Sequence, residues 1–129
     1  MSKWKLKGIE LFPDLREEIE NPENSIYTFF FELLQRVRQA HLNKNQSELE
    51  NIYGFAKWCF QQTAKDLWNA ASVGFYEHLG DDEITRKEIT KWITPQMFEQ
   101  LSPLFQNRMN EKDYLELCNY YNYQNKINA

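Results

Sequence analysis

The chain has 129 residues and a formal net charge of −4, and 42% of its residues are hydrophobic, which predicts one domain with a sizeable core. Aromatic residues make up 16% of the chain. Because each buried ring removes roughly 150–250 Å² from water, this content excludes intrinsic disorder. Four glycines and four prolines are too few for the turns of a β-sandwich or barrel. The acidic balance disfavours a nucleic-acid partner, since phosphates would be repelled.

The two cysteines and the N-terminal residues indicate where in the cell the protein is located and whether it binds a metal. Cys59 and Cys118 fall within predicted helices and are expected to be small buried thiols, and no CxxC pair indicates zinc or redox chemistry. The first 12 residues lack the apolar run of a signal peptide, and no apolar segment approaches about 18 residues. The sequence therefore predicts a cytoplasmic protein without a membrane segment, metal or cofactor.

The N-terminal region combines an undecided element with an acidic run. Residues 1–12 fit either a short helix or an extended arm, and Pro13 then opens a short helix. Six acidic residues lie between positions 10 and 23, against the single base Arg16. This run is either a solvated helix face or a docking surface for a basic partner. The residues that would form the docking surface are Glu17, Glu18 and Glu20.

The next helix is predicted to start at Asn21-Pro22, an N-cap residue followed by proline, and to run to about His41. Its apolar positions recur every three or four residues, which indicates a wide face turned toward the core. They are Ile26, Phe29, Phe30, Leu33, Val37 and Ala40.

Residues 47–79 carry a long helical pattern without proline. Ser47 and Glu50 match a capping box, and Thr63 with Asp66 repeats the pattern. One unbroken helix of this length would span roughly 50 Å at 1.5 Å per residue. We therefore expect two helices with a break near residues 61–63, and a single long helix is the alternative.

Short helices are expected in the C-terminal part of the chain. Gly80 is predicted to end a helix in the left-handed conformation, and Asp81 or Asp82 to cap the next helix, over residues 84–93. Further helix starts are expected at Thr94-Pro95, at Ser102-Pro103 and at Asn110 with Asp113. Residues 122–129 are expected to form a frayed C-terminal tail. Together these elements predict an all-α fold, an irregular single-domain bundle of about six to eight helices.

Glu77, His78, Asp81 and Asp82 form an EHLGDD segment with ligand types that can bind a metal. No H-x-x-x-H or E-x-x-H pair accompanies them on one helix. A helix end followed by an N-cap is the favoured interpretation, with His78 near the negative helix end.

Aromatic residues outside the apolar stripes are candidate partner contacts. Trp58 lies off the main stripe and either packs under another helix or is exposed to a partner. Tyrosines cluster near the C-terminus, and they suit a core edge and an interface equally well. The cluster comprises Tyr114, Tyr120, Tyr121 and Tyr123, and we assign Trp58, Tyr120 and Tyr121 to the partner surface.

Arg36 and His41 match R-x-x-x-x-H, which resembles the motif of HEPN-type ribonucleases. The resemblance implies His41 as acid/base and Arg36 as phosphate anchor. Val37 follows the arginine, where those enzymes usually carry a polar residue.

Two segments, YGFAKWCF at residues 53–60 and ASVGFYEHL at residues 71–79, resemble a family of small uncharacterised bacterial helical proteins. Some members of such families are immunity proteins of polymorphic toxin systems. The resemblance implies a non-enzymatic, cytoplasmic protein that binds and blocks a toxin, and a basic toxin would match the acidic run. An RNA-cleaving enzyme and a structural, homodimerising domain are the alternatives.

Overall fold

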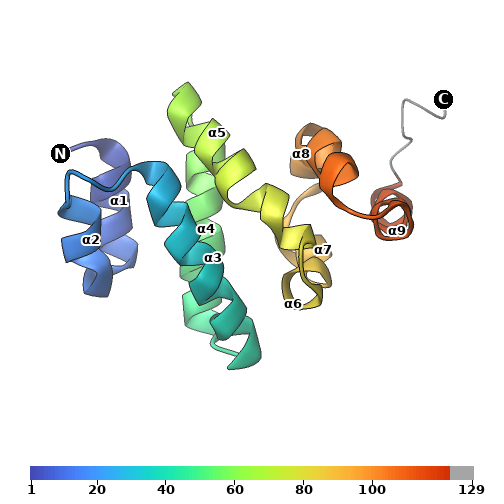
Figure 1. Cartoon of the computed structure of the whole chain (residues 1–129), viewed down its shortest axis with the longest axis horizontal. Helices are drawn as coiled ribbons and strands as arrows, with labels where there is room; N and C mark the ends of the chain where they lie inside the picture. Colours follow the sequence, from blue (N-terminus) through green and yellow to red (C-terminus); the bar gives the residue numbers. More distant parts are fainter. Residues whose placement is uncertain (123–129) are drawn as a thin grey trace. The chain divides into compact units, whose positions relative to one another are not determined.

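The structure, a computed structural model, describes residues 1–122 (Figure 1). These residues contain helices and no strand, which confirms the all-α prediction. Among them, six α-helices have nine residues or more and three have five or fewer. Contacts group the chain into two compact units, unit 1 at Met1–Tyr76 and unit 2 at Glu77–Ala129, and each is described by itself. The expectation of one domain stays a prediction.

The first residues form a helix, α1 (Lys3–Leu11), so the alternative of an extended arm over residues 1–12 is wrong. Trp4 and Phe12 are buried and fix this segment to the core. Gly8 lets α1 pack closely, because a Cβ at this position would lie 3.2 Å from Cδ1 of Ile19. Helix α1 therefore belongs to the folded body of unit 1.

A short 3₁₀ turn, Pro13–Leu15, leads into α2 (Arg16–Glu20), as the proline predicts. The next helix, α3 (Ile26–Leu42), starts later than Asn21-Pro22, so that predicted start is wrong. Ser25 and Thr28 instead form a capping box, in which each side chain accepts a hydrogen bond from the other's backbone N–H. The predicted apolar stripe of α3 is buried throughout.

The long helical pattern forms two helices, α4 (Gln46–Phe60) and α5 (Lys65–Gly74), which confirms the expected break. Both predicted caps are wrong. Asn45 caps α4 by accepting a hydrogen bond from the backbone N–H of Glu48, and Ser47 donates its hydroxyl to Asn45. Helix α5 begins after Ala64 without a side-chain cap.

Helices α3, α4 and α5 pack against one another in unit 1, and α1 packs on α4 (Figure 1). Aromatic rings fill the space between them. Phe29 meets Phe55 edge to face at 5.4 Å between ring centroids, and Phe55 also contacts Phe12 and Phe30. Phe30 continues the contact to Phe75. Phe55 thus lies at the centre of a connected ring cluster.

Unit 2 begins with the end of a 3₁₀ segment, Tyr76–Gly80, followed by α6 (Glu83–Arg86) and α7 (Ile89–Trp92). The single helix expected over residues 84–93 is therefore two short ones. Asp82 caps α6 as predicted, by accepting from the backbone N–H of Thr85. Gly80 does not adopt a positive φ, so the left-handed prediction is wrong. A Cβ at Gly80 would lie 2.7 Å from Cγ of Met109, so close packing explains this glycine.

Helices α8 (Pro95–Arg108) and α9 (Glu111–Tyr121) complete unit 2, with Thr94 and Asn110 as their predicted N-caps. The restart expected at Ser102-Pro103 is wrong, because Pro103 lies inside α8. Asn122 follows α9 in the left-handed conformation. The rest of the predicted frayed end, with Tyr123, lies outside the described residues.

Hydroxyl groups join the segments of unit 2. Thr85 donates to the carbonyl of Leu79 at 2.6 Å, and Tyr121 donates to the carbonyl of Ile93 at 2.6 Å. Burial, followed by the interaction with Tyr120, raises the pKa of Tyr121 to about 12, so its hydroxyl keeps the proton it donates.

Both cysteines are buried and free, as expected. Burial, followed by the negative charge of Asp66, raises the pKa of Cys59 to about 12. Within residues 1–122, no helix combines the length and apolar character needed to cross a bilayer.

Candidate functional site

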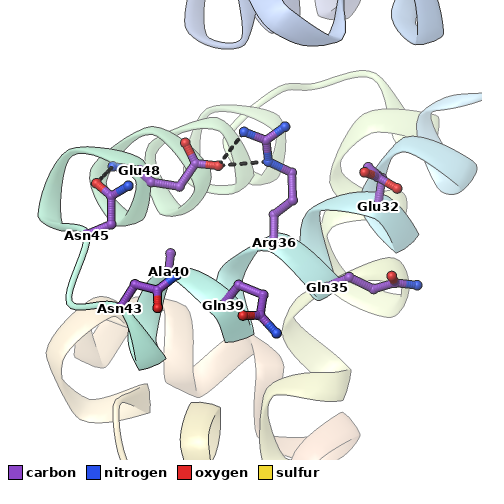
Figure 2. A pocket seen from close by; sticks show the side chains of 8 residues that line it. All are labelled: Glu32, Gln35, Arg36, Gln39, Ala40, Asn43, Asn45 and Glu48. Carbon is purple, nitrogen blue, oxygen red and sulfur yellow. Dashed lines mark hydrogen bonds and ion pairs between the residues drawn. The ribbon is translucent and has the colours of Figure 1, made fainter.

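A polar groove of about 430 Å³ lies on unit 1, along the C-terminal half of α3 and the start of α4 (Figure 2). Three of its eight lining side chains are charged, and three more carry a carboxamide; a fourth carboxamide, that of Asn45, caps α4. The lining comprises Glu32, Gln35, Arg36, Gln39, Ala40, Asn43, Asn45 and Glu48. Because α3 supplies residues at spacings of three and four, these side chains share one side of the helix.

Arg36 crosses the groove and holds carboxylates from two other elements. Its Nη2 lies 2.7 Å from Oε1 of Glu48 on α4, and its Nη1 lies 2.9 Å from Oδ2 of Asp14 in the 3₁₀ turn before α2. Partial burial alone would lower the pKa of Arg36, but the hydrogen bonds to Asp14 and Glu48 raise it above its ordinary value. The guanidinium therefore stays charged and links the 3₁₀ turn to α4.

Two large apolar side chains lie exposed on the same solvent-facing side of α3. Phe31 is 57% exposed and Leu42 is 58% exposed. The spacing from Phe31 through Gln35 and Gln39 to Leu42 is four, four and three residues, which keeps all four on one side of the helix. An apolar residue thus lies at each end of the polar row.

Apart from Arg36, the residues of the groove and of the exposed side of α3 were not predicted as a site. A signal was present in the position of Phe31, which lies outside the apolar stripe predicted for α3. The exposure of Gln35 and Gln39 follows from the same stripe, since they alternate with its buried members. The proximity of Asp14 and Glu48 to Arg36 depends on tertiary packing and left no local pattern.

The acidic residues chosen from the sequence lie on α2 and differ in their partners. Glu17 and Glu18 are exposed. Glu20 accepts a hydrogen bond from Nε of Arg16 at 2.7 Å, which neutralises part of the acidic run. The 3₁₀ turn that precedes this helix contacts the groove through the ion pair of Asp14 with Arg36.

The predicted aromatic contacts are not equally available. Trp58 is half-buried and stacks on Phe55 at 6.4 Å, so part of its ring belongs to the core of unit 1. Tyr121 stacks on Phe98 at 4.3 Å and is half-buried. Tyr120 is 64% exposed and leaves most of its ring in solvent.

Arg36 and His41 contact different partners. Arg36 holds the two carboxylates described above, whereas Nε2 of His41 lies 2.7 Å from the hydroxyl of Tyr53 on α4. The groove lining includes Arg36 and does not include His41. The expected acid/base and phosphate anchor therefore do not line one cavity.

The EHLGDD segment of unit 2 forms a polar cluster around Asp81. Arg108 donates two hydrogen bonds to this carboxylate, at 3.1 and 2.8 Å, and Nδ1 of His78 lies 3.0 Å from it. Burial alone would raise the pKa of Asp81, but the bonds to Arg108 and His78 lower it. In the described part of the chain, no group of three or more histidine, cysteine or acidic residues could hold a metal ion.

Residues 7–110 match the model of a domain of unknown function, DUF7674. The chain belongs to this family. No curated protein and no solved structure matches it. The DUF7674 segment includes the whole groove, the exposed side of α3 and the Asp81 cluster. Tyr114, Tyr120 and Tyr121 lie beyond it, so the tyrosine-rich end is outside the family segment.

Proposed function

We propose that this DUF7674 protein is a non-enzymatic protein-binding module that docks a partner on the exposed side of α3. The observation that supports it most is the pair of exposed apolar side chains, Phe31 and Leu42, which lie on the same side of α3 as the groove residues Gln35 and Gln39. They are eleven positions apart on the helix, or roughly 16 Å at 1.5 Å per residue. Apolar contacts beside hydrogen-bonding groups are typical of protein interfaces.

The charge of the neighbouring surface favours a basic partner. Glu17 and Glu18 are exposed on α2, and Asp14 in the turn directly before α2 pairs with Arg36 in the groove. Complementary charge steers a basic protein toward such a surface and speeds its association. An immunity-type inhibitor of a basic bacterial toxin is the form of this proposal that the resemblance of residues 53–60 and 71–79 supports. The two free, buried cysteines suit a reducing compartment such as the cytoplasm.

The proposal is tested with Leu42→Gln, Phe31→Gln and the control Leu6→Gln. Leu6 is 57% exposed on α1, so its replacement removes a matched apolar side chain from a helix other than α3. Each variant serves as bait for proteins from a lysate of the source cells, with binding then measured by calorimetry. We expect Leu42→Gln and Phe31→Gln to weaken the captured complex at least tenfold, an interface-type loss above about 1.4 kcal/mol. Equal affinity of Leu42→Gln and Leu6→Gln for the captured protein would contradict docking on α3.

A second copy of the chain is another occupant of the same surface. Sedimentation equilibrium of the wild type and of Phe31→Gln separates this outcome from binding of a different protein. A dimer that dissociates on Phe31→Gln would favour the structural, homodimerising alternative and would overturn docking of a different protein.

A further inference from the structure

We infer that the groove binds the guanidinium group of an arginine side chain on the partner. This inference rests on the proposed function and names the chemical group that the groove recognises. Arg36 pairs with Glu48 in the groove and with Asp14 beside it, and Glu32 also lines the groove, so these four groups together carry a net charge of −2. A cation is therefore attracted to the groove, and a phosphate is repelled.

The groove also has hydrogen-bonding groups that the chain does not use. The side chains of Glu32, Gln35, Gln39 and Asn43 line it, and within residues 1–122 none of them makes a hydrogen bond or ion pair. Figure 2 shows them set around Arg36, while the dashed interactions involve Arg36, Glu48 and Asn45. One carboxylate and three carboxamide oxygens are thus open to an incoming donor.

Arginine fits this set of acceptors better than lysine does. Its planar guanidinium presents five N–H donors and can bind a carboxylate through two parallel hydrogen bonds, whereas lysine presents a compact ammonium group. The volume of about 430 Å³ lies within the usual range of ligand sites, roughly 300–1,000 Å³.

The two carboxylates on Arg36 explain why its positive charge does not block the groove. Glu48 and Asp14 each lie within 3 Å of its guanidinium nitrogens, and they neutralise it before any ligand enters. Glu32 is exposed and keeps its full charge for the ligand. We therefore assign Glu32 as the main contact of the incoming guanidinium.

The inference is tested by titrating the protein with three capped tripeptides that differ only at the central residue: arginine, lysine and citrulline. Citrulline keeps the shape of arginine and lacks its charge. The readout is the NMR shift of the side-chain amides of Gln35, Gln39 and Asn43. We expect the arginine peptide to shift them with a dissociation constant in the roughly millimolar range, a few kcal/mol of binding. We expect weaker binding of lysine and no saturable shift with citrulline.

Two glutamate variants give the matched control. Glu32→Gln should weaken the arginine peptide about fivefold, the loss expected for about 1 kcal/mol of a solvent-exposed ion pair. Glu23→Gln removes the same charge from an exposed position outside the groove lining and should leave the affinity unchanged. Equal shifts with citrulline, or equal losses in both variants, would overturn the inference.

The outcomes separate the two proposals. No shift with the arginine peptide, together with a partner lost on Leu42→Gln, removes the groove inference and leaves docking on α3 in place. A saturable arginine shift, together with partner binding that Leu42→Gln does not change, removes docking on α3.

Discussion

Different side chains join the helices in the interiors of the two units. In unit 1, the rings of Phe29, Phe30 and Phe55 connect α3 to α4, and the side-chain hydrogen bonds of His41 with Tyr53 and of Asn69 with Tyr27 are part-buried. In unit 2, fully buried side-chain hydrogen bonds join Thr85 to the carbonyl of Leu79 and the hydroxyl of Ser102 to that of Tyr114.

Element length explains part of this difference. The central helices of unit 1 have 17, 15 and 10 residues, while α6 and α7 of unit 2 have four each. A four-residue helix offers about one turn of apolar surface, so packing alone defines its position weakly. A buried hydrogen bond from a hydroxyl group is directional, so it fixes the position of a short helix relative to the segment that it contacts.

The largest expected effect is in the ring cluster. Phe55→Ala removes the ring that contacts Phe12, Phe29 and Phe30 and should lower the free energy of unfolding by about 3–5 kcal/mol. Hydrogen exchange with mass spectrometry should show the loss of protection first in peptides from residues 1–76. Loss of protection confined to residues 77–122 would contradict the central place of this ring.

The hydroxyl bond of Thr85 gives the next largest effect. Thr85→Val keeps the shape of the side chain and leaves the carbonyl of Leu79 without its donor. The free energy of unfolding, measured with urea, should fall by about 2 kcal/mol. Thr85→Ser keeps the hydroxyl and is the control. If Thr85→Ser were as destabilising as Thr85→Val, packing of the methyl group would matter more than the hydrogen bond.

A pair of glycine substitutions should act in opposite directions. Gly80→Ala forces Met109 to move and should destabilise by about 1–2 kcal/mol. Gly54→Ala places a methyl group in open space on the exposed side of α4 and should stabilise by about 0.5–1 kcal/mol. Thermal unfolding of both variants measures the difference, and a stabilised Gly80→Ala would show that Met109 adapts freely.

The smallest effect concerns pH. Because Arg108 and His78 lower the pKa of Asp81, the folded state binds a proton here less tightly than the unfolded state does. The resulting stability is present above the ordinary carboxyl pKa of about 4 and is lost as the pH falls below it. The free energy of unfolding of the wild type should therefore exceed that of Asp81→Asn by under about 1 kcal/mol at pH 7, and by less at pH 3, as measured by urea unfolding at both pH values. A difference that grows in acid would contradict this assignment.

The sequence predicted the elements whose signals are local and strong. The buried stripe of α3, the break between α4 and α5, and the starts at Thr94-Pro95 and Asn110 are present in the structure. Competing local signals caused the errors at helix starts. Asn21-Pro22 fits a start, but the reciprocal bonds of Ser25 and Thr28 place it four residues later.

Other features depend on contacts that no local pattern encodes. Pro103 is tolerated inside α8 because it and Glu99, the residue four positions earlier, are exposed, and water can replace the missing N–H donor. Gly80 is explained by Met109, which lies 29 positions away. The groove likewise needs Asp14 and Glu48 brought to Arg36 from separate elements. The exposure of Glu17, Glu18 and Glu20 on α2 could be expected from their charge, whereas their role as a docking surface stays a prediction.

The two buried cysteines provide one native labelling site in each unit, whose modification rate reports local opening. Cys59 lies in unit 1 and Cys118 in unit 2, and neither thiol is open to solvent in the folded chain. With a pKa of about 12, Cys59 is almost entirely a thiol at neutral pH, while alkylating reagents react with the thiolate. Modification at each cysteine therefore waits for its surroundings to open. Timed labelling, read out by peptide mass, would report the two opening rates from the native sequence without an added probe.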